Sequence, residues 1–349
     1  MTCDVIMLSW NRLDMTKNFI ESFWSNASVS SRLIIIDNAS TDGTVEYLSL
    51  LKDSSDRALK IVFNKENKGF VGGMNQGMAI SDAPYVCLAN NDLLFTKGWL
   101  EEIVNIFQRY PQIGLLNPNS NNLGERFCEK EISLYNFAND IRNKYRGVFI
   151  EMPFCIGFCM VIKRDVINKI GALSEDFYPA FFEDSDYSLR TVKAGYRIGM
   201  AKGSYVWHKE HASFDKMDKK KTEGLFKRNR EIFVKKWGRI LRVACICHHT
   251  KQVDQHAQDI TEVARQGNYV NIFCKKEKVI DHSGVKCMVY KTMFDLIWKI
   301  LIKKKRYDVV ITDNTFLYNV FKVCGYYVLR NLNIGKIYEF RHRIETAHG

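Results

Sequence analysis

The sequence has ten cysteines but no Cys-x-x-Cys pair. Cys155 with Cys159, and Cys245 with Cys247, stand in short apolar runs that read as strands. A buried free thiol is the usual state of a cysteine in such a run. We therefore expect free thiols and a reducing, cytoplasmic environment.

Long apolar runs are also missing. Residues 1–8 have no basic region followed by a long apolar core, so they are not expected to act as a signal peptide. The longest apolar stretch, Val148 to Ile162, is interrupted by Glu151 and Pro153 and is shorter than the ~20 residues that cross a bilayer. We expect no membrane span, and a cytoplasmic protein with peripheral contact at the inner face of the plasma membrane.

The composition is that of a folded globular protein, with 46% hydrophobic and 26% charged residues in 349 positions. This length predicts two domains, which we place at residues 1–240 and 241–349. The net charge of +12 favours an anionic partner: nucleic acid, a membrane surface or a phosphorylated substrate. Much of the excess lies between Lys216 and Arg242, where it forms either a solvated helix face or a functional patch.

Short apolar runs alternate with amphipathic segments, which predicts an α/β fold with a mostly parallel sheet flanked by helices. The expected strands of the first domain are 5–8, 33–36, 60–63 and 85–89, and its expected helices are 14–24, 44–51, 99–110 and 222–237. The polar stretch 117–146 is expected to be a long loop or irregular insertion.

The alternation restarts after Gly238. It predicts strands at 243–247, 269–274, 286–290 and 308–312, and helices at 255–266 and 293–304. This is a second, smaller Rossmann-like unit, and we see no clear final element in its sequence.

Polar clusters follow the first four strands, where ligands of open parallel sheets bind. Trp10, next to Ser9, can stack on a base, and Asp37 can accept a hydrogen bond from a pyrimidine N–H. An Asx turn or helix cap is the alternative role of Asp37.

A glycine-rich run, Asn67 to Gly77, is expected to be a loop that opens into a helix. Its bare amides could approach phosphate or ribose oxygens, although a tight turn is the commoner use of such a run. It does not match Gly-x-Gly-x-x-Gly.

Carboxylates mark two further places. Asp92 follows the fourth strand and suits a divalent ion that also binds diphosphate oxygens. Glu183, Asp184 and Asp186 precede a helical stretch, where they act either as helix caps or as a general base with a raised pKa. His208 follows a strand and could complete a metal site.

Taken in order, these motifs resemble the family-two inverting glycosyltransferases with the GT-A fold, particularly rhamnosyl- and galactofuranosyltransferase-like members of bacterial polysaccharide assembly. The resemblance covers Val5 to about Gly238. Its motifs are Ser9-Trp10-Asn11-Arg12, Asp37 to Gly43, Asn67 to Asn75, Asn90-Asn91-Asp92, Phe182 to Asp186, Trp207-His208 and Phe233 to Gly238.

The resemblance implies a role for each of these positions. Asp184 would be the catalytic base, and Asp92 with His208 would hold Mn²⁺ or Mg²⁺. The acceptor side would include Gly157, Phe158 and Glu183. The nucleotide-sugar side would comprise Ser9, Trp10, Asp37, Asn67, Gly69, Gly73, Asn75, Asn90, Asn91 and Asp92. The family's aspartate-rich motif reads Asn90-Asn91-Asp92 here, so only Asp92 supplies a carboxylate.

The implied reaction transfers a sugar such as rhamnose or galactofuranose from a UDP- or dTDP-sugar to a saccharide or lipid-linked saccharide. Residues 243–249 also resemble the opening of a GT-B-type glycosyltransferase domain, with a scaffold or oligomerisation domain as the alternative. Two rival classes stay open: a nucleic-acid or anionic-surface binding protein that uses the basic stretch, and a glycan-binding module without catalysis. The carboxylates of the first domain argue against nucleic acid. The basic stretch fits contact with anionic lipid better.

Overall fold

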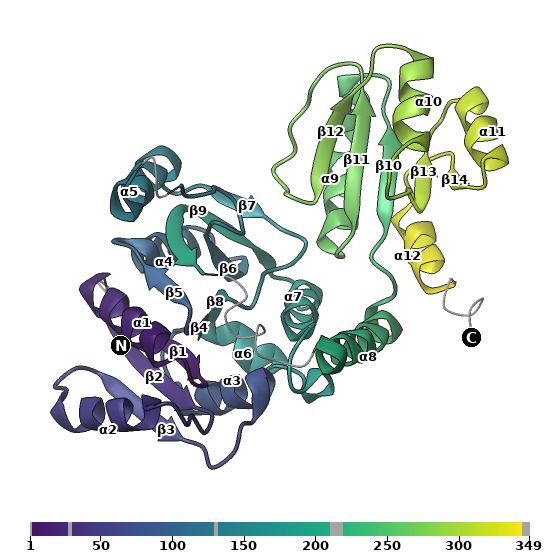
Figure 1. The fold of residues 1–349 in the computed structure, drawn as a ribbon. Coiled ribbons are helices and arrows are strands. Elements are labelled where there is room, and N and C mark those ends of the chain that lie inside the picture. The colour runs from purple at the N-terminus through teal and green to yellow at the C-terminus, as the bar shows by residue number, and fades with distance from the viewer. Residues whose placement is uncertain (1, 27–29, 129–131, 210–218, 344–349) are drawn as a thin grey trace. The chain divides into compact units, whose positions relative to one another are not determined.

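The computed structural model describes residues 2–26, 30–128, 132–209 and 219–343. The chain divides into two compact units: Met1–Ile150 with Phe154–Ile232, and Glu151–Pro153 with Phe233–Gly349. Each unit is built on its own sheet (Figure 1). The predicted α/β class is confirmed.

The first unit alternates strands and helices in its N-terminal half. Its elements there are β1 (Cys3–Ser9), α1 (Leu13–Asn26), β2 (Ser31–Asp37), α2 (Thr44–Ser54), β3 (Leu59–Phe63), α3 (Gly69–Ile80), β4 (Tyr85–Asn90), β5 (Leu93–Phe95) and α4 (Trp99–Arg109). The strands and helices expected in this half are confirmed, with ends shifted by a few residues.

The second half of this unit is less regular. It comprises β6 (Ile113–Asn119), α5 (Leu134–Tyr145), β7 (Phe149–Glu151), β8 (Cys159–Lys163), α6 (Arg164–Ile170), the 3-10 turn η1 (Glu175–Phe177), α7 (Glu183–Lys193), β9 (Arg197–His208) and α8 (Lys219–Trp237). The expectation of a loop at 117–146 is wrong, because this stretch contains the end of β6 and the helix α5. Ser133 caps α5 by accepting from Asn136 N, and Ala138 and Ile141 pack with Tyr205.

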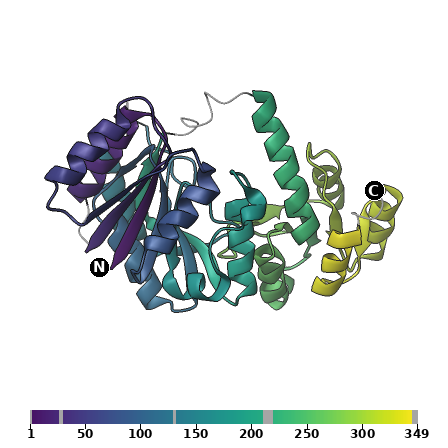
Figure 2. The same cartoon turned by 90° about the horizontal axis from the view of Figure 1, so that it is seen from below.

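Within the described residues, the first sheet has the order β3-β2-β1-β4-β8-β6-β9-β5, with β7 beside β9. Strands β3, β2, β1 and β4 are parallel, and their register sets Ser9 opposite Asp37 and Leu8 opposite Asn90. The carboxyl ends of these strands therefore meet at one edge. Helices cover both faces of the sheet (Figure 2).

Successive side chains of β1 point to opposite faces of the sheet, so each face packs against its own layer of helices. Val5 and Met7 pack with Phe19 and Phe23 of α1 in the main core. On the other face, a Cβ added at Gly77 of α3 would lie 2.3 Å from the Ile6 side chain. The glycines of α3 therefore let this helix approach β1 closely.

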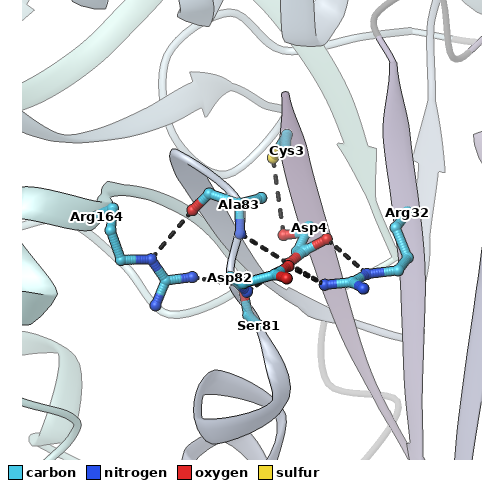
Figure 3. Close-up of polar contacts among 7 residues, drawn as sticks. All are labelled: Cys3, Asp4, Arg32, Ser81, Asp82, Ala83 and Arg164. Carbon is cyan, nitrogen blue, oxygen red and sulfur yellow. Dashed lines mark hydrogen bonds and ion pairs between the residues drawn. The ribbon is translucent and has the colours of Figure 1, made fainter. Parts of the chain in front are cut away.

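The opposite, amino-terminal edge is held by a buried aspartate (Figure 3). Asp4 is fully buried and accepts hydrogen bonds from Arg32 Nε and Nη2 at 2.9 and 2.8 Å, and from Ser81 Oγ at 2.6 Å. Arg164 extends the network by donating to Ser81 Oγ at 2.6 Å. Burial raises the pKa of Asp4, but these hydrogen bonds outweigh it and the pKa is lowered.

The second unit is a five-stranded parallel sheet in the order β12-β11-β10-β13-β14. Its elements are β10 (Arg242–Ile246), α9 (Thr250–Arg265), β11 (Tyr269–Cys274), β12 (Val285–Val289), α10 (Met293–Leu301), β13 (Val309–Ile311), α11 (Thr315–Val323), β14 (Tyr327–Leu329) and α12 (Ile334–Arg343). The expectation of no clear final element is wrong, since α11, β14 and α12 follow β13. Val253 of α9 and Ile337 of α12 share one core, whereas Leu296 of α10 and Leu317 of α11 share another.

The thiols of the described cysteines are free, as expected. None of the helices in the described residues combines the length and apolar character needed to cross a bilayer.

Candidate active site

A cavity of about 730 Å³ opens in the first unit. Its walls include residues that follow β1, β2 and β4, together with the segment around α7 and the end of β9. Ten of the predicted site residues line it: Trp10, Asn67, Gly69, Asn90, Asn91, Gly157, Phe158, Glu183, Asp184 and His208. Residues almost 200 positions apart in the sequence, such as Trp10 and His208, thus line the same cavity.

The loop after β1 presents Trp10 to this cavity with 42% of its surface exposed. Asn11 follows it in the left-handed region, at a φ of 58°, and its backbone N–H donates to Ser40 Oγ at 2.7 Å. An exposed indole held on a braced loop is suited to stacking on a flat ring.

Asp37 lies behind this loop and is fully buried. Ser40 donates to both of its oxygens, from the backbone N–H at 3.0 Å and from Oγ at 2.5 Å. The backbone bond reaches three residues along the chain, as a side-chain cap does, and through Ser40 it supports the loop that carries Trp10. A contact between Asp37 and a base stays a prediction.

The glycine-rich run is helical from Gly69, so the expected loop is wrong in its extent. Gly69 has a φ of +65°, and a Cβ added there would lie 2.4 Å from Pro179 Cβ. At Gly73 an added Cβ would meet Leu8 Cδ1 at 2.3 Å. These two glycines serve close packing in this structure.

Three other predicted residues of the nucleotide-sugar set make protein contacts. Asn67 Oδ1 accepts from Gly69 N at 2.8 Å and forms an Asx turn just before α3. Asn75 exchanges hydrogen bonds with Leu173, and its Nδ2 also donates to Glu175 at 2.8 Å. Ser9 is buried, with its hydroxyl 3.2 Å from Thr16 Oγ1. Of Ser9, Asp37, Gly73 and Asn75, none lines the cavity.

Asn38 is a cavity residue that the sequence interpretation did not single out. It is buried at the end of β2, its Nδ2 donates to Gly69 O at 3.0 Å, and its Oδ1 accepts from Asn64 Nδ2 at 2.9 Å. This amide links the first parallel strands to the start of α3.

Asp92 and His208 meet because β5 pairs with β9. The antiparallel register sets Leu93 opposite His208, and Lys209 N donates to Asp92 O at 3.0 Å. Asp92 Oδ1 therefore lies 3.2 Å from His208 Nε2. Both side chains are buried, and Oδ1 accepts no hydrogen bond from the described residues.

Two asparagines fix the position of His208, and the sequence interpretation missed both. Asn121 accepts from His208 N at 2.8 Å and donates to His208 O at 2.8 Å, so its amide acts as a strand partner. Asn122 Nδ2 lies 2.8 Å from His208 Nδ1. The ring also stacks on Phe158 with centroids 5.0 Å apart. The sequence feature that could have pointed to these residues is the Asn121-Asn122 pair within a polar stretch.

Asp184 is the second residue of helix α7 and lines the cavity. Gly157 N donates to its Oδ2 at 3.0 Å, and Ser185 donates to Oδ1 from N at 2.6 Å and from Oγ at 3.2 Å. Burial raises the pKa of Asp184, and these hydrogen bonds oppose that rise because they stabilise the anion.

Glu183 is the more strongly perturbed member of the pair. Burial, together with the charge of Asp184, raises the pKa of Glu183 to about 8. Its Oε2 is buried without a hydrogen-bond partner among the described residues. Burial thus favours the protonated form of Glu183, whereas the hydrogen bonds to Asp184 stabilise the anion of that residue.

The two residues before this pair have left-handed backbones, with φ of 79° at Phe181 and 69° at Phe182. Such a conformation is costly for a bulky residue and is concentrated at functional sites. Both rings pack against Phe226 of α8, with centroids 5.7 and 5.1 Å apart. This aromatic cluster forms an apolar wall of the cavity beside the carboxylates.

The Asp92–His208 pair fits a divalent cation. A buried carboxylate oxygen without a hydrogen bond faces an imidazole nitrogen, and oxygen with nitrogen donors suit Mn²⁺. Among the described residues, no three His, Cys, Asp or Glu side chains gather closely enough to hold a metal ion by themselves. A cation here would take its remaining ligands from substrate oxygens and water.

Comparison with known proteins identifies the first unit. The family model described as Glycosyl transferase family 2 matches residues 4–171. The O-antigen chain rhamnosyltransferase WbaN of Salmonella anatum is 25% identical over 201 residues, which cover 54% of this chain and 60% of that protein. A galactofuranosyl glycosyltransferase of Leishmania donovani is 22% identical over 214 residues, covering 51% of this chain and 49% of that protein.

One solved structure is similar over part of the chain. Mannosyltransferase PcManGT from Pyrobaculum calidifontis, in complex with GDP-Man and Mn²⁺, is 18% identical with a TM-score of 0.47, and the match covers 60% of this chain and 58% of that one. The chain spans between about a quarter and a half of the length of the first curated relatives it matches. The family model matches the segment that carries Trp10, Asp92 and Gly157, and for this segment the resemblance to glycosyl transferase family 2 that was seen in the sequence is confirmed.

Proposed function

We propose that the first unit transfers a sugar from a nucleotide diphosphate donor to an acceptor hydroxyl with inversion at the anomeric carbon. The observation that carries this proposal is the convergence of two groups on one site: the Glu183–Asp184 pair at the cavity, and the Asp92–His208 pair beside it. One pair suits proton removal, and the other suits a cation that binds a diphosphate.

The donor is a UDP- or dTDP-sugar in this proposal. Trp10 offers its exposed face to the base. Asn67, Gly69, Asn90 and Asn91 line the cavity nearby. Asp92 and His208 would hold Mn²⁺ or Mg²⁺, which when bound offsets the charge of the departing diphosphate.

Asp184 removes the proton from the acceptor hydroxyl as that oxygen attacks the anomeric carbon. The Gly157 N–H fixes the Oδ2 atom of this carboxylate. Glu183 stays protonated at neutral pH and so leaves Asp184 as the anion of the pair. The aromatic wall of Phe181, Phe182 and Phe226 keeps water from the reacting atoms.

The acceptor is a saccharide or lipid-linked saccharide, and the sugar is rhamnose, galactofuranose or a close relative. The names of the Salmonella and Leishmania relatives support this class. The role would belong to the synthesis of cell-surface polysaccharides. Nucleic acid is disfavoured as a partner because the site is lined by carboxylates, which repel a phosphate backbone.

A thermal-shift screen of UDP, dTDP and GDP, each with and without Mn²⁺, tests the donor site. A ligand that binds only the folded state stabilises it by about 2.7 kcal/mol at a hundred times its Kd. We expect one nucleotide to raise the melting temperature, and Mn²⁺ to enhance the rise.

Asp92→Asn should remove the Mn²⁺-dependent part of this rise, whereas Asp82→Asn, a change at an exposed carboxylate outside the cavity, should leave it intact. If no nucleotide shifts the melting of the wild type under either condition, the proposed donor site is wrong.

A further inference from the structure

Helix α10 of the second unit is apolar on two sides. Leu296 and Ile300 are buried in the core shared with α11. Phe294 and Trp298, however, are 76% and 55% exposed, and Ile302 just after the helix is 56% exposed. The spacing of four residues places these three on one side of the helix.

The exposed side is ordered. The rings of Phe294 and Trp298 stack at 6.3 Å with planes 15° apart. Leu301, also exposed, borders the same side. A helix with a second apolar side that packs on nothing marks an interaction surface.

Helix α11 extends this surface. It shares the core of α10 through Leu317 and Phe321, so the two helices cover the same face of the sheet. Arg306 donates to Cys324 O, which brings the residues after α10 next to the end of α11. Val323, at that end, is 89% exposed.

Four cations follow the apolar side directly: Lys303, Lys304, Lys305 and Arg306, all exposed. Lys322 adds a fifth on α11. The carboxylate of α10, Asp295, is engaged by Lys299 Nζ at 3.0 Å and by Lys291 N at 2.9 Å. We call the exposed parts of α10 and α11, with residues 302–306, the aromatic-basic face.

We propose that the aromatic-basic face lies on an anionic lipid bilayer. Exposed aromatic and aliphatic side chains beside clustered lysines are the signature of a helix that rests in the membrane interface. The apolar side chains enter the acyl boundary, while the lysines reach phosphate headgroups. This inference is independent of the proposed sugar transfer.

Charge decides between the possible occupants of this face. A second copy of the chain would set the run 303–306 against itself, which costs energy by repulsion. The basic helix α8 is a weaker lipid surface, since Phe226 is its exposed large apolar residue among those described, and this ring lines the cavity.

Flotation of the full chain with vesicles tests the proposal. Vesicles of phosphatidylglycerol and phosphatidylcholine in equal parts should capture the chain at low salt, and pure phosphatidylcholine should capture much less. Lys303→Glu with Lys304→Glu and Lys305→Glu should weaken capture at least about tenfold, because each basic residue near the surface contributes to the attraction. Phe294→Ser with Trp298→Ser should weaken it comparably.

The matched control is Lys219→Glu with Lys220→Glu and Lys221→Glu, the same charge change on α8. It should leave capture near the wild-type value, and thermal unfolding should show that every variant folds. Absence of capture by anionic vesicles would overturn the proposal. Equal loss in the α8 control would also overturn it, as would capture that survives both changes on α10.

Discussion

Single residues would decide how the proposed site binds a cation, and Asn122 is the sharpest case. If its amide nitrogen donates to His208 Nδ1, the neutral ring carries its proton on Nε2, the atom that faces Asp92. A metal needs that proton on Nδ1 instead, with a carbonyl or carboxylate accepting it.

We predict that Asn122→Asp favours the Nδ1–H form and binds Mn²⁺ at least as tightly as the wild type. Asn122→Leu removes the donor to Nδ1 and so should not weaken Mn²⁺ binding. Calorimetry measures the affinity, and the ¹⁵N shifts of His208 report the tautomer without reference to activity. Unchanged shifts in both variants would remove Asn122 from this role.

At the same scale, Glu183 and Asp184 are adjacent carboxyl groups with different environments and different proposed roles. Glu183 has a buried oxygen without a hydrogen bond, whereas Asp184 accepts from Gly157 and from Ser185. The sequence crowds both together without distinguishing them. Burial and the charge of Asp184 raise the pKa of Glu183, whereas the hydrogen bonds from Gly157 and Ser185 stabilise the anion of Asp184.

The elements are held together at two edges of the first sheet, and the amino-terminal edge gives a stability prediction. Asp4→Asn should lower the free energy of unfolding by about 3 kcal/mol at pH 7, because it breaks a buried ion pair with Arg32. Asp82→Asn, which removes the exposed carboxylate bonded to the same arginine, should cost less than about 1 kcal/mol.

The effect of Asp4 should depend on pH. Its folded pKa lies below the unfolded value of about 4. Its stabilising effect is therefore complete above that unfolded value and is lost as the pH falls through the folded pKa. Urea unfolding of wild type and Asp4→Asn should converge in strongly acidic buffer, and a constant difference across pH would contradict the account.

Helix α3 gives a second prediction at the scale of elements. Gly77→Ala should destabilise the chain by about 1–3 kcal/mol, since the new methyl group would overpack against Ile6. At Gly224 of α8 an added Cβ meets no heavy atom within 4 Å, so Gly224→Ala should gain up to about 1 kcal/mol from helix propensity. Thermal melts of the two variants that shift in the same direction would refute this packing argument.

On the scale of the whole molecule, the sequence was enough to predict features that depend on local patterns, namely hydrophobic periodicity and the polar residues that follow strands. It predicted β1 to β4 and most of the second unit, and it identified Trp10, Asp184 and His208, which the structure brings to one cavity. It took the start of α3 for a loop because a glycine that allows close packing looks like one that frees a loop.

Other features depend on contacts distant in sequence. The antiparallel strand β8 enters between β4 and β6, and an apolar run does not reveal that position. Asn121 and Asn122 matter through contacts with the backbone and the ring of His208, 87 and 86 residues away. Helix α5 was hidden because its polar surface outweighs the few side chains that it buries.

The most direct test of the proposed chemistry compares two nearly isosteric changes in the Glu183–Asp184 pair. The transfer rate of Asp184→Asn should fall at least about 100-fold, while the affinity for the nucleotide stays close to that of the wild type. Glu183→Gln resembles the protonated acid that the wild type has below a pH of about 8, and should retain most of the rate at neutral pH. An active Asp184→Asn enzyme, or a Glu183→Gln enzyme as impaired as Asp184→Asn, would contradict the assignment of Asp184 as the base.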